Sequence, residues 1–392
     1  MKNNTAQKNI PKGWKYDELG TFIAEIADGG TPSRSNTNYF GGDIPWVVVN
    51  DIRKDINKTK ETLTEDGLNN SSAKVWPAGT VILSFGATIG EVGIANVPLT
   101  TKQGIAGIIP KDELLNTYLY YLLLKNKNRL KQLSSGSTIK EVRPAVIKKQ
   151  IKVLIPPIYE QQKIAEILGS VDEDILKTQG VIEVTEKLKK GLMQELFAKS
   201  KNNNWKIVKM KDICKVRQGL QIPIKKRFKD SGSSRFVYIT LKYLKELENT
   251  EYIENPKQSV ICKKDDILMT RTGNTGIVVT GVSGVFHNNF FLIDFNRKRI
   301  DKDFLVYYLR SSVIQKIILD KAGTTTIPDL NHGDFYSIDF IMPSLKEQKK
   351  IAEILSAVDE KISVNKKLKS KLIQLKKGLA QDLLSGKVRV VG

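Results

Sequence analysis

The sequence predicts an α/β protein in which two similar globular parts are joined by two long antiparallel helices that form a coiled coil, with a pseudo-twofold internal repeat. Three observations predict this fold: a helical phrase that occurs twice, a long apolar stripe along each copy of it, and the same order of short strands before each copy. The chain has 392 residues, which is more than one ordinary hydrophobic core accommodates.

The repeat is clearest in the segments EQQKIAEIL and EQKKIAEIL, which begin at Glu160 and Glu347, 187 residues apart. The same offset relates the later segments VDE and LKKGL, and the prolines Pro156 and Pro343 that precede each phrase. Earlier in each half the identity fades but the order of motifs survives, which is typical of two equivalent structural units. We therefore divide the chain into globular parts at 1–156 and 200–343 and helical segments at 157–199 and 344–392.

Each helical segment is predicted to be one helix. From Ile158 to about Phe197 apolar residues recur in steps of mostly three and four, and no proline interrupts them. About 40 residues make a rod of ~60 Å, and a rod with one apolar stripe needs a partner, for which the other copy is the nearest. The alternative is that each helix packs only on its own globular part; the near-identity of the two helices argues against it.

The residues that we expect to form the contacts of the two helices with each other and with partners are Ile164, Leu168, Val171, Ile175, Ile351, Leu355, Val358 and Ile362. The predicted stripe continues through Leu188 in the first copy and through Leu368 and Leu375 in the second.

The globular parts consist of short apolar runs separated by glycines, which indicates strands, followed by a helix and a last strand. In the first part the runs GTVILS, GEVGIANV and GIAGIIP precede a helix that starts at Lys111, and IKVLIP follows it. The second part repeats this order with DDILMT, GIVVTG and NNFFLIDF, a helix from about Asp303 to Leu319, and SIDFIMP.

The net charge is +21, from 63 Lys and Arg against 42 Asp and Glu. Such an excess points to a polyanionic partner, with nucleic acid ahead of an anionic membrane surface. Both globular parts are basic whereas the first helical segment is slightly acidic, so the charge is not evenly scattered. No apolar run approaches the ~18 residues that span a bilayer, and the first residues lack the apolar core of a signal peptide. We expect a cytoplasmic protein with no membrane partner.

No catalytic residues and no metal site are predicted. The chain contains no G-x-x-x-x-G-K-[ST] phosphate loop, no dinucleotide fingerprint after a strand, and no proline–aromatic element of amino-methyltransferases. His287 and His332 have no Ser or Cys partner at a diagnostic spacing and are interpreted as polar loop residues. Asp329 and Asp334 suggest a nuclease cluster only faintly, because the companion Glu-x-Lys is missing.

Binding chemistry remains. Sequence readout of DNA uses Arg for guanine, Asn or Gln for adenine, and Lys, Ser and Thr for phosphates. Any single polar loop is better explained by solvation, but here such loops recur at matched places in two basic parts. The candidate DNA-binding residues are Arg34, Asn36, Asn38, Arg53, Lys54, Lys102, Gln103, Ser137, Lys140, Arg143, Arg217, Gln218, Gln221, Lys225, Lys226, Arg227, Arg271, Asn274, Asn288, Asn289, Thr324 and Asn331.

Taken together, the chain resembles the specificity subunit of type I restriction-modification enzymes. The likeness rests on a tryptophan near each start, a glycine-hydroxyl loop, and a proline followed by E-Q-x-K-I-A-E-I-L and a Lys-rich helix, with everything repeated once. It covers essentially the whole chain. The second part departs from the pattern at Gly219, where GLQIP stands in place of GGTP.

The resemblance implies two target recognition domains that each read one half of an asymmetric bipartite site in double-stranded DNA. It also implies that the helices set the half-site separation and dock two methyltransferase subunits. The chain itself would be non-catalytic and need no cofactor, with S-adenosylmethionine in the methyltransferase subunits, and ATP and Mg²⁺ in two motor-nuclease subunits where these are present. Three alternatives stay open: a specificity subunit of a related phage-defence methylation system without a nuclease arm, a non-catalytic coiled-coil DNA-binding scaffold, and a nucleic-acid enzyme that acts alone through a catalytic cluster that the sequence does not reveal.

Overall fold

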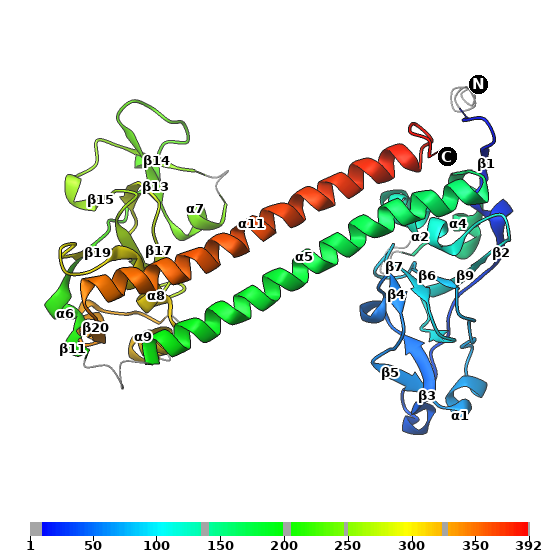
Figure 1. Cartoon of the computed structure of the whole chain (residues 1–392), viewed down its shortest axis with the longest axis horizontal. Coiled ribbons are helices and arrows are strands. Elements are labelled where there is room, and N and C mark those ends of the chain that lie inside the picture. Colours follow the sequence, from blue (N-terminus) through cyan, green and yellow to red (C-terminus); the bar gives the residue numbers. More distant parts are fainter. Residues whose placement is uncertain (1–9, 135–140, 199–204, 247–249, 324–327, 391–392) are drawn as a thin grey trace. The chain divides into compact units, whose positions relative to one another are not determined.

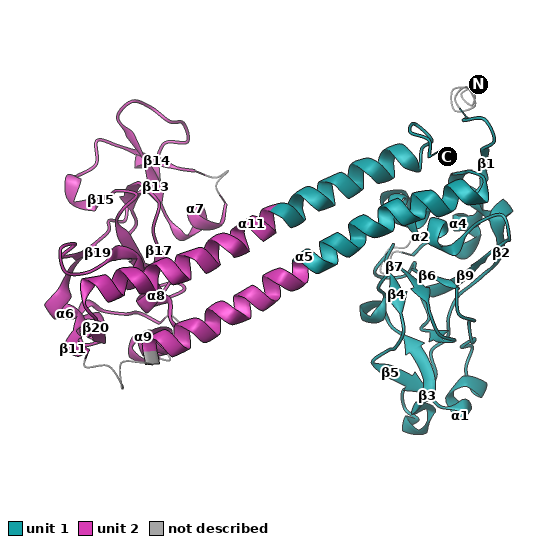
Figure 2. Ribbon diagram, in the orientation of Figure 1, with its two compact units in different colours: residues 1–178, 368–392 teal, residues 179–367 magenta. Residues whose placement is uncertain are grey.

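The computed structural model describes residues 10–134, 141–198, 205–246, 250–323 and 328–390, and divides into two compact units (Figures 1 and 2). Unit 1 contains residues 1–178 and 368–392, and unit 2 contains residues 179–367. Each unit therefore holds one globular part together with a section of each long helix, so the unit boundaries cut across the helices.

Within its described residues, unit 1 has a five-stranded sheet in the order β2 (Ile23–Ala27), β9 (Ile105–Pro110), β6 (Val81–Ser84), β7 (Val92–Ala95) and β4 (Asp55–Ile56). A three-stranded sheet has the order β5 (Glu61–Leu63), β3 (Phe40–Val47) and β8 (Thr100–Thr101). Strand β1 (Lys15–Glu18) pairs antiparallel with β10 (Lys152–Ile155). The short helices are α1 (Glu65–Asn69), α2 (Asn116–Lys125), α3 (Lys127–Leu133) and α4 (Pro144–Gln150).

The described part of unit 2 repeats this plan, with a sheet in the order β12 (Cys214–Gln218), β19 (Phe290–Phe295), β16 (Ile267–Thr270) and β17 (Val278–Val279). A second sheet has the order β14 (Tyr252–Glu254), β13 (Arg235–Ile239), β18 (Gly284–Phe286) and β15 (Ile261–Cys262), and β11 (Lys206–Lys209) pairs with β20 (Asp339–Met342). Its short helices are α6 (Met210–Ile213), α7 (Leu241–Lys245), α8 (Lys302–Arg310), α9 (Ser312–Ala322) and α10 (His332–Tyr336). The matching strand orders confirm the α/β repeat.

The predicted single helix of each globular part is wrong in detail, because both are broken in two. The first begins at Asn116 rather than at Lys111, and it breaks at Asn126, whose side-chain amide donates to the carbonyl of Leu122 at 2.8 Å. The second breaks at Ser311, which has an extended backbone and caps the start of α9 with its hydroxyl. Polar side chains that form hydrogen bonds with the nearby backbone offer it an alternative to the regular helical hydrogen bonds, and the helix ends there.

The two long helices are α5 (Ile158–Ala198) and α11 (Leu345–Leu383). Their first turns belong to the hydrophobic cores: Ile164 and Leu168 are fully buried in the core of unit 1, and Ile351 and Leu355 are buried in that of unit 2. The end of α11 joins the unit 1 core through Leu383. From the sequence we argue against packing of each long helix on its own globular part, and for these turns that prediction is wrong.

The two helices also pair with each other. In unit 1 Glu160 and Asp172 of α5 form ion pairs with Arg389, which follows α11, and with Lys376 of α11. Rising residue numbers on one chain segment meet falling numbers on the other, so the segments run antiparallel.

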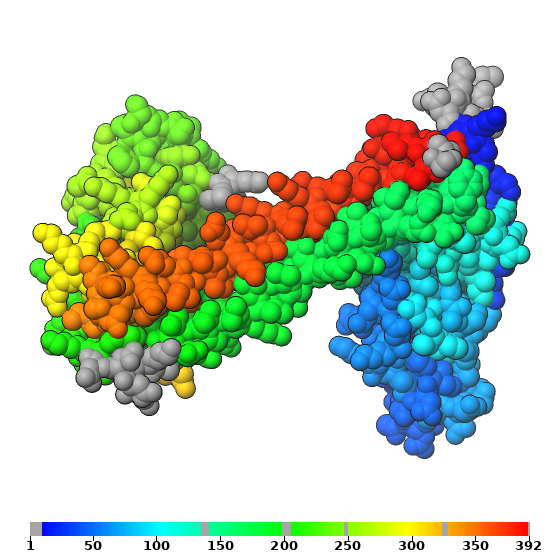
Figure 3. Space-filling model, viewed as in Figure 1, coloured from blue at the N-terminus to red at the C-terminus, as the bar shows by residue number. Residues whose placement is uncertain are grey.

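Unit 2 shows the same sense of pairing, with Glu186 of α5 bound to Lys366 at 2.7 Å and Lys189 bound to Asp359 at 2.6 Å. The space-filling view shows the α11 section lying along the α5 section within each unit (Figure 3). The antiparallel helix pair is thus confirmed inside each unit.

The contact face of the helices is more polar than predicted. Its least exposed positions on α5 follow alternating steps of four and three, the spacing of a coiled-coil seam, and they include Thr178 and Thr185. Leu188 and Leu375, which the predicted stripe included, are instead 54% and 52% exposed. The neighbouring Lys189 occupies the seam position because its ammonium group pairs with a carboxylate of the other helix.

Candidate nucleic-acid interface and its helical support

A buried glutamine fixes the first turn of each long helix on its globular part. In unit 1 the side-chain oxygen of Gln161 accepts from the backbone N–H of Leu115, and its amide donates to the carbonyls of Glu113 and Pro156, all at 2.8 Å. Gln348 makes the matching three bonds in unit 2, with Asp301, Arg299 and Pro343. The repeated E-Q of the sequence therefore serves to orient the helix on the globular part.

A Tyr–Asp–Lys cluster connects the globular part of unit 1 to both long helices. The hydroxyl of Tyr121 on α2 donates to Oδ2 of Asp172 on α5 at 2.8 Å, and Nζ of Lys376 on α11 lies 2.5 Å from Oδ1 of the same carboxylate. The ammonium group also lies 5.5 Å from the centre of the Tyr121 ring, within the range of a cation–π contact.

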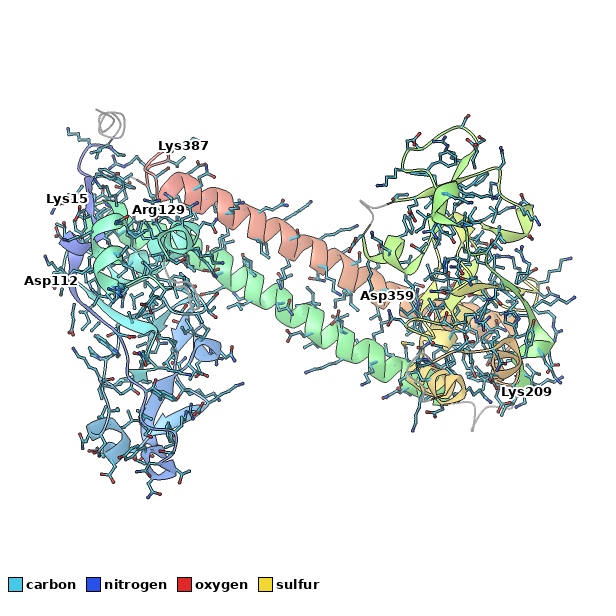
Figure 4. The ribbon with its side chains drawn as sticks, turned by 180° about the vertical axis from the view of Figure 1, so that it is seen from behind. Lys15, Asp112, Arg129, Lys209, Asp359 and Lys387 are labelled. Atoms are coloured by element: carbon cyan, nitrogen blue, oxygen red, sulfur yellow. The ribbon has the colours of Figure 1, made fainter. Side chains whose placement is uncertain are left out.

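Unit 2 contains the same cluster with the helices exchanged. Tyr307 on α8 donates to Asp359 on α11 at 2.8 Å, and Lys189 on α5 pairs with that carboxylate at 2.6 Å and lies 5.4 Å from the tyrosine ring (Figure 4 labels Asp359). Burial raises the pKa of Tyr307 to about 12, so the hydroxyl keeps its proton and remains a donor. Lys189 and Lys376 are equivalent by the repeat, and so are Asp359 and Asp172, which makes the two clusters equivalent members of the repeat.

Glu160 differs from its counterpart Glu347. Its carboxylate is fully buried and accepts from the indole N–H of Trp14 at 3.0 Å and from the guanidinium of Arg389 at 2.7 and 3.0 Å. Burial raises the pKa of Glu160, but these hydrogen bonds outweigh it and hold the pKa below its ordinary value. Glu347 accepts from the indole of Trp205 at 3.2 Å and from its own helix cap.

The globular part of unit 1 contains a cavity of about 700 Å³ that brings together two of the predicted DNA-binding residues, Lys102 and Gln103. The sequence interpretation missed the other polar residues that line it, which are Asp28, Thr31, Asn50, Thr88 and Glu141. A signal was available, because the repeated segments IAEIADGG and ICKVRQGL align Asp28 with the predicted residue Gln218.

The remaining candidates of unit 1 lie elsewhere on its surface. Arg34 is half exposed, forms an ion pair with Glu61, and stacks over Phe40 and Trp46 with its guanidinium carbon 4.6 and 4.9 Å from the ring centres. Of the other candidates, Asn38, Arg53 and Arg143 are exposed, whereas Asn36 and Lys54 are partly buried.

In unit 2 five polar residues gather around the turn after β16. The guanidinium of Arg271 donates to both oxygens of Asp329, at 2.9 and 2.6 Å, and to the side-chain oxygen of Gln218 at 2.8 Å. The Gln218 amide donates to the carbonyl of Asn288 at 3.1 Å, and the carbonyl of Asn289 accepts from the backbone N–H of Arg271. Two predicted DNA-binding side chains, those of Arg271 and Gln218, thus come within one network, which Asn288 and Asn289 join through their backbone carbonyls.

Arg227 has a structural role in this fold. Its guanidinium bonds the carbonyl of Ile222 and the carboxylate of Glu251, its side chain is 18% exposed, and it lies over the Tyr238 ring. The candidates Gln221, Lys225, Lys226, Asn274 and Asn331 are exposed, and Arg217 is partly buried. Ser137, Lys140 and Thr324 lie outside the described residues.

In the described part of the chain, no group of three or more His, Cys, Asp and Glu side chains could hold a metal ion. Asp329 is paired with Arg271, and Asp334 accepts from Asn331, so these two carboxylates are committed to local contacts. His287 accepts from the backbone N–H of Asn289, and burial lowers its pKa. No described helix is long and apolar enough to cross a membrane.

Two similar α/β units, each fixed to two antiparallel helices and each carrying its own set of polar loops, define an internally repeated recognition subunit. The chain belongs to the family of type I restriction modification DNA specificity domains, whose model matches residues 11–186 and 202–374. The two matched segments correspond to the two repeats.

Some relatives match nearly the full length of this chain. The chain is 29% identical to the specificity subunit of the type I restriction enzyme MjaIX from Methanocaldococcus jannaschii, over 97% of this chain and 95% of the relative. It is 37% identical, over 33% of this chain and 29% of the relative, to the specificity subunit of the type I restriction enzyme HindI from Haemophilus influenzae. The crystal structure of a type I system S subunit from M. genitalium has the same fold, with a TM-score of 0.63, 19% identity and 97% of both chains covered.

Proposed function

We propose that this chain is the DNA-recognition subunit of a type I restriction-modification complex, and that each globular part reads one half of an asymmetric bipartite target in double-stranded DNA. Family membership and the net charge of +21 support the choice of ligand. The difference between the polar residues around the matched turns of the two units supports two unlike half-sites.

The helices, in this proposal, set the distance between the half-sites. The observation that carries it is the repeated Tyr–Asp–Lys cluster, which joins each globular part to sections of both helices through a hydroxyl, a carboxylate and an ammonium group. Flexible attachment would not require the same three side chains twice. Half-site centres about one helical turn apart, ~34 Å, would face the same side of the duplex.

Two methyltransferase subunits are proposed to dock on the helices, and two motor-nuclease subunits in a complete restriction complex. The matched positions Leu188 of α5 and Leu375 of α11 are 54% and 52% exposed, and so are large parts of the matched Val181 and Leu368. Exposed apolar side chains at equivalent places suit two copies of one partner. S-adenosylmethionine, ATP and Mg²⁺ would be bound by the partners, and this chain would take no part in bond making or breaking.

Methylome sequencing of cells with and without the chain tests the recognition role. We expect a split motif of two short unlike parts with a methylated adenine on each strand, and we expect it to vanish on deletion of the chain. A methylome that is unchanged by the deletion would contradict the proposal.

The docking surface is tested by Leu188→Arg and Leu375→Arg, which we expect to abolish co-purification with the methyltransferase subunit because they place charge on an apolar contact. Leu355 and Val358 are poorer targets, since Leu355 is fully buried in the core of unit 2 and its replacement would unfold the chain. Leu176→Arg is the matched control, because Leu176 is 68% exposed but its repeat counterpart is Ser363. Full co-purification of both arginine variants would exclude this surface.

A further inference from the structure

The cavity of unit 1 has a counterpart position in unit 2, which backbone hydrogen bonds identify. The N–H groups of Phe85 and Arg271 donate to the carbonyls of Gly104 and Asn289, at 2.9 and 2.8 Å. Their own carbonyls accept from the N–H groups of the residues that follow Glu141 and Asp329, both at 3.0 Å. Phe85 is therefore equivalent to Arg271, and Glu141 to Asp329.

A second pair of bonds aligns the strand ends. The N–H groups of Gly29 and Gly219, which follow Asp28 and Gln218, donate to the first residues of β9 and β19, at 3.1 and 3.0 Å. A side chain at either glycine would collide with the backbone of a neighbouring segment, so the close approach of the two segments requires glycine at both positions. Asp28 is therefore equivalent to Gln218.

The three matched positions have opposite character in the two units. In unit 2 the guanidinium of Arg271 lies between Asp329 and Gln218 and bonds both, so the space is filled and the carboxylate is neutralised. In unit 1 Phe85 occupies the arginine position and has no donor to offer, so Asp28 and Glu141 line a cavity of about 700 Å³ instead.

The carboxylate of Asp28 is held in one orientation. Its Oδ1 accepts from the N–H groups of Gly29 and Gly104, both at 2.8 Å, which leaves Oδ2 as an acceptor. Burial raises the pKa of Asp28, and the negative charge of Glu141 raises it further against the lowering effect of the backbone hydrogen bonds. Within the described residues Asp28 forms no ion pair, and a fixed, partly desolvated acceptor gains from a ligand that donates.

The rest of the lining is mixed, with hydroxyls of Thr31 and Thr88 and donors on Lys102 and Gln103. The volume lies within the ~300–1,000 Å³ typical of small-ligand sites. Phosphate is a poor occupant because two carboxylates would repel it. Among base edges in the major groove, only adenine N6 and cytosine N4 present a donor, whereas guanine and thymine present acceptors there.

We infer that this cavity reads one nucleobase of the first half-site through its exocyclic amino group, with Asp28 as the principal acceptor and Glu141 as the second, and that unit 2 makes no such contact at its matched position. The inference rests on the proposed function, since it names a specificity-determining contact of the same recognition surface. Adenine and cytosine share the required chemistry, and the experiment distinguishes them.

The test uses the full chain in complex with its methyltransferase subunits and the motif that methylome sequencing returns. Each adenine of the motif is replaced in turn by purine, and each cytosine by 2-pyrimidinone, which removes only the exocyclic amino group. At one position we expect the wild-type complex to bind about tenfold more weakly. The identity of that position decides between adenine and cytosine.

Asp28→Asn completes the cycle. Asparagine keeps an oxygen for the two glycine N–H groups and presents an amide donor in place of the second acceptor, so the variant should bind the parent duplex about tenfold more weakly and no longer respond to the missing amino group. Glu141→Gln, at a half-exposed side chain, serves as the second variant if Asp28→Asn perturbs folding. Asp112→Asn is the control, because Asp112 is exposed and outside the cavity lining (Figure 4 labels it).

The outcomes separate the two proposals. A wild-type chain that directs no split motif defeats the proposed function and the inference with it. A normal motif with no position sensitive to the amino group, or with sensitivity that persists unchanged in both Asp28→Asn and Glu141→Gln, overturns the inference alone.

Discussion

Units 1 and 2 use the same side chains where they contact the long helices and different ones around the turn that follows the central strands β6 and β16. Gln161 and Gln348 make the same three bonds, and the Tyr–Asp–Lys clusters agree within a few tenths of an ångström. At the turn, Phe85 stands where unit 2 has Arg271, and a cavity replaces an ion pair. The helix contacts have one geometry in both units, which requires the same side chains in each. The turns have no common geometry to preserve, so their side chains can differ.

The largest expected effect comes from Gln161→Leu and Gln348→Leu. Each leaves three buried or partly buried backbone groups without their side-chain partner, so we expect a loss of about 3 kcal/mol in the local free energy of opening. Amide hydrogen exchange read by mass spectrometry locates the loss at the start of α2 in the first variant and of α8 in the second. Effects that differ by more than a factor of two would show that the two units are not held equivalently.

The helix clusters are tested by Asp172→Asn and Asp359→Asn. Removing the charge weakens the contact with lysine and tyrosine, for which we expect about 1.5 kcal/mol, with Asp172 the more sensitive because its side chain is 16% exposed against 38% for Asp359. Hydrogen exchange along α5 and α11 measures the change. Glu173→Gln, at an exposed position beside the cluster, is the control and should have no effect.

Exchanging the turn residues sharpens the contrast between the units. Phe85→Arg should bring a guanidinium close to Asp28 and Glu141 and abolish readout of the amino group; because Phe85 is only 4% exposed and packs in the core of unit 1, hydrogen exchange must also show that the variant keeps its fold. Arg271→Phe leaves Asp329 and Gln218 unpaired at a partly exposed site and should cost about 1 kcal/mol. DNA affinity on the parent and amino-lacking duplexes, together with hydrogen exchange, reports both changes; a Phe85→Arg variant that reads normally would contradict the assignment of the cavity.

The smallest effect is a pH dependence at Glu160 of unit 1, which depends on Arg389, whereas the pKa of the matched Glu347 in unit 2 is lowered by Ser344 and Trp205. The pKa of Glu160 is held below its ordinary value of 4.5, so its contribution to stability is complete above that pH and is lost as the pH falls through the lower folded value. The indole N–H resonance of Trp14 should therefore shift on acidification. Arg389→Gln should move the Trp14 transition to higher pH and leave the transition of the Trp205 indole, which reports on Glu347, at its wild-type pH; a substitution that moves both transitions would show that the effect is not local.

The sequence predicted the repeat, the long helices and the order of the central strands along the chain. These features follow from hydrophobic periodicity and from glycines between short apolar runs, which are local properties of the sequence. It did not predict β3 or β13, whose ladders connect distant segments. It also assigned Leu188 to the helix contact and overlooked Lys189, because the seam position of a lysine depends on a carboxylate of the other helix. Of the candidate site, Lys102 and Gln103 were predicted as DNA-binding residues, but their neighbours in the cavity come from four separate loops.

By itself the sequence determined that this protein contains one structural unit twice, with basic globular parts and two matching helices. Repeated motifs and repeated hydrophobic periodicity can be read from the sequence without knowledge of tertiary contacts. Only the tertiary structure decided which polar side chains meet. The distance from Asp28 to Glu141 along the chain is over a hundred residues, and the matched residue beside them is a buried phenylalanine in unit 1 and an arginine that pairs with its neighbours in unit 2. The sequence gives the chemistry of each side chain, but a binding site depends on the strand pairing that brings distant residues together.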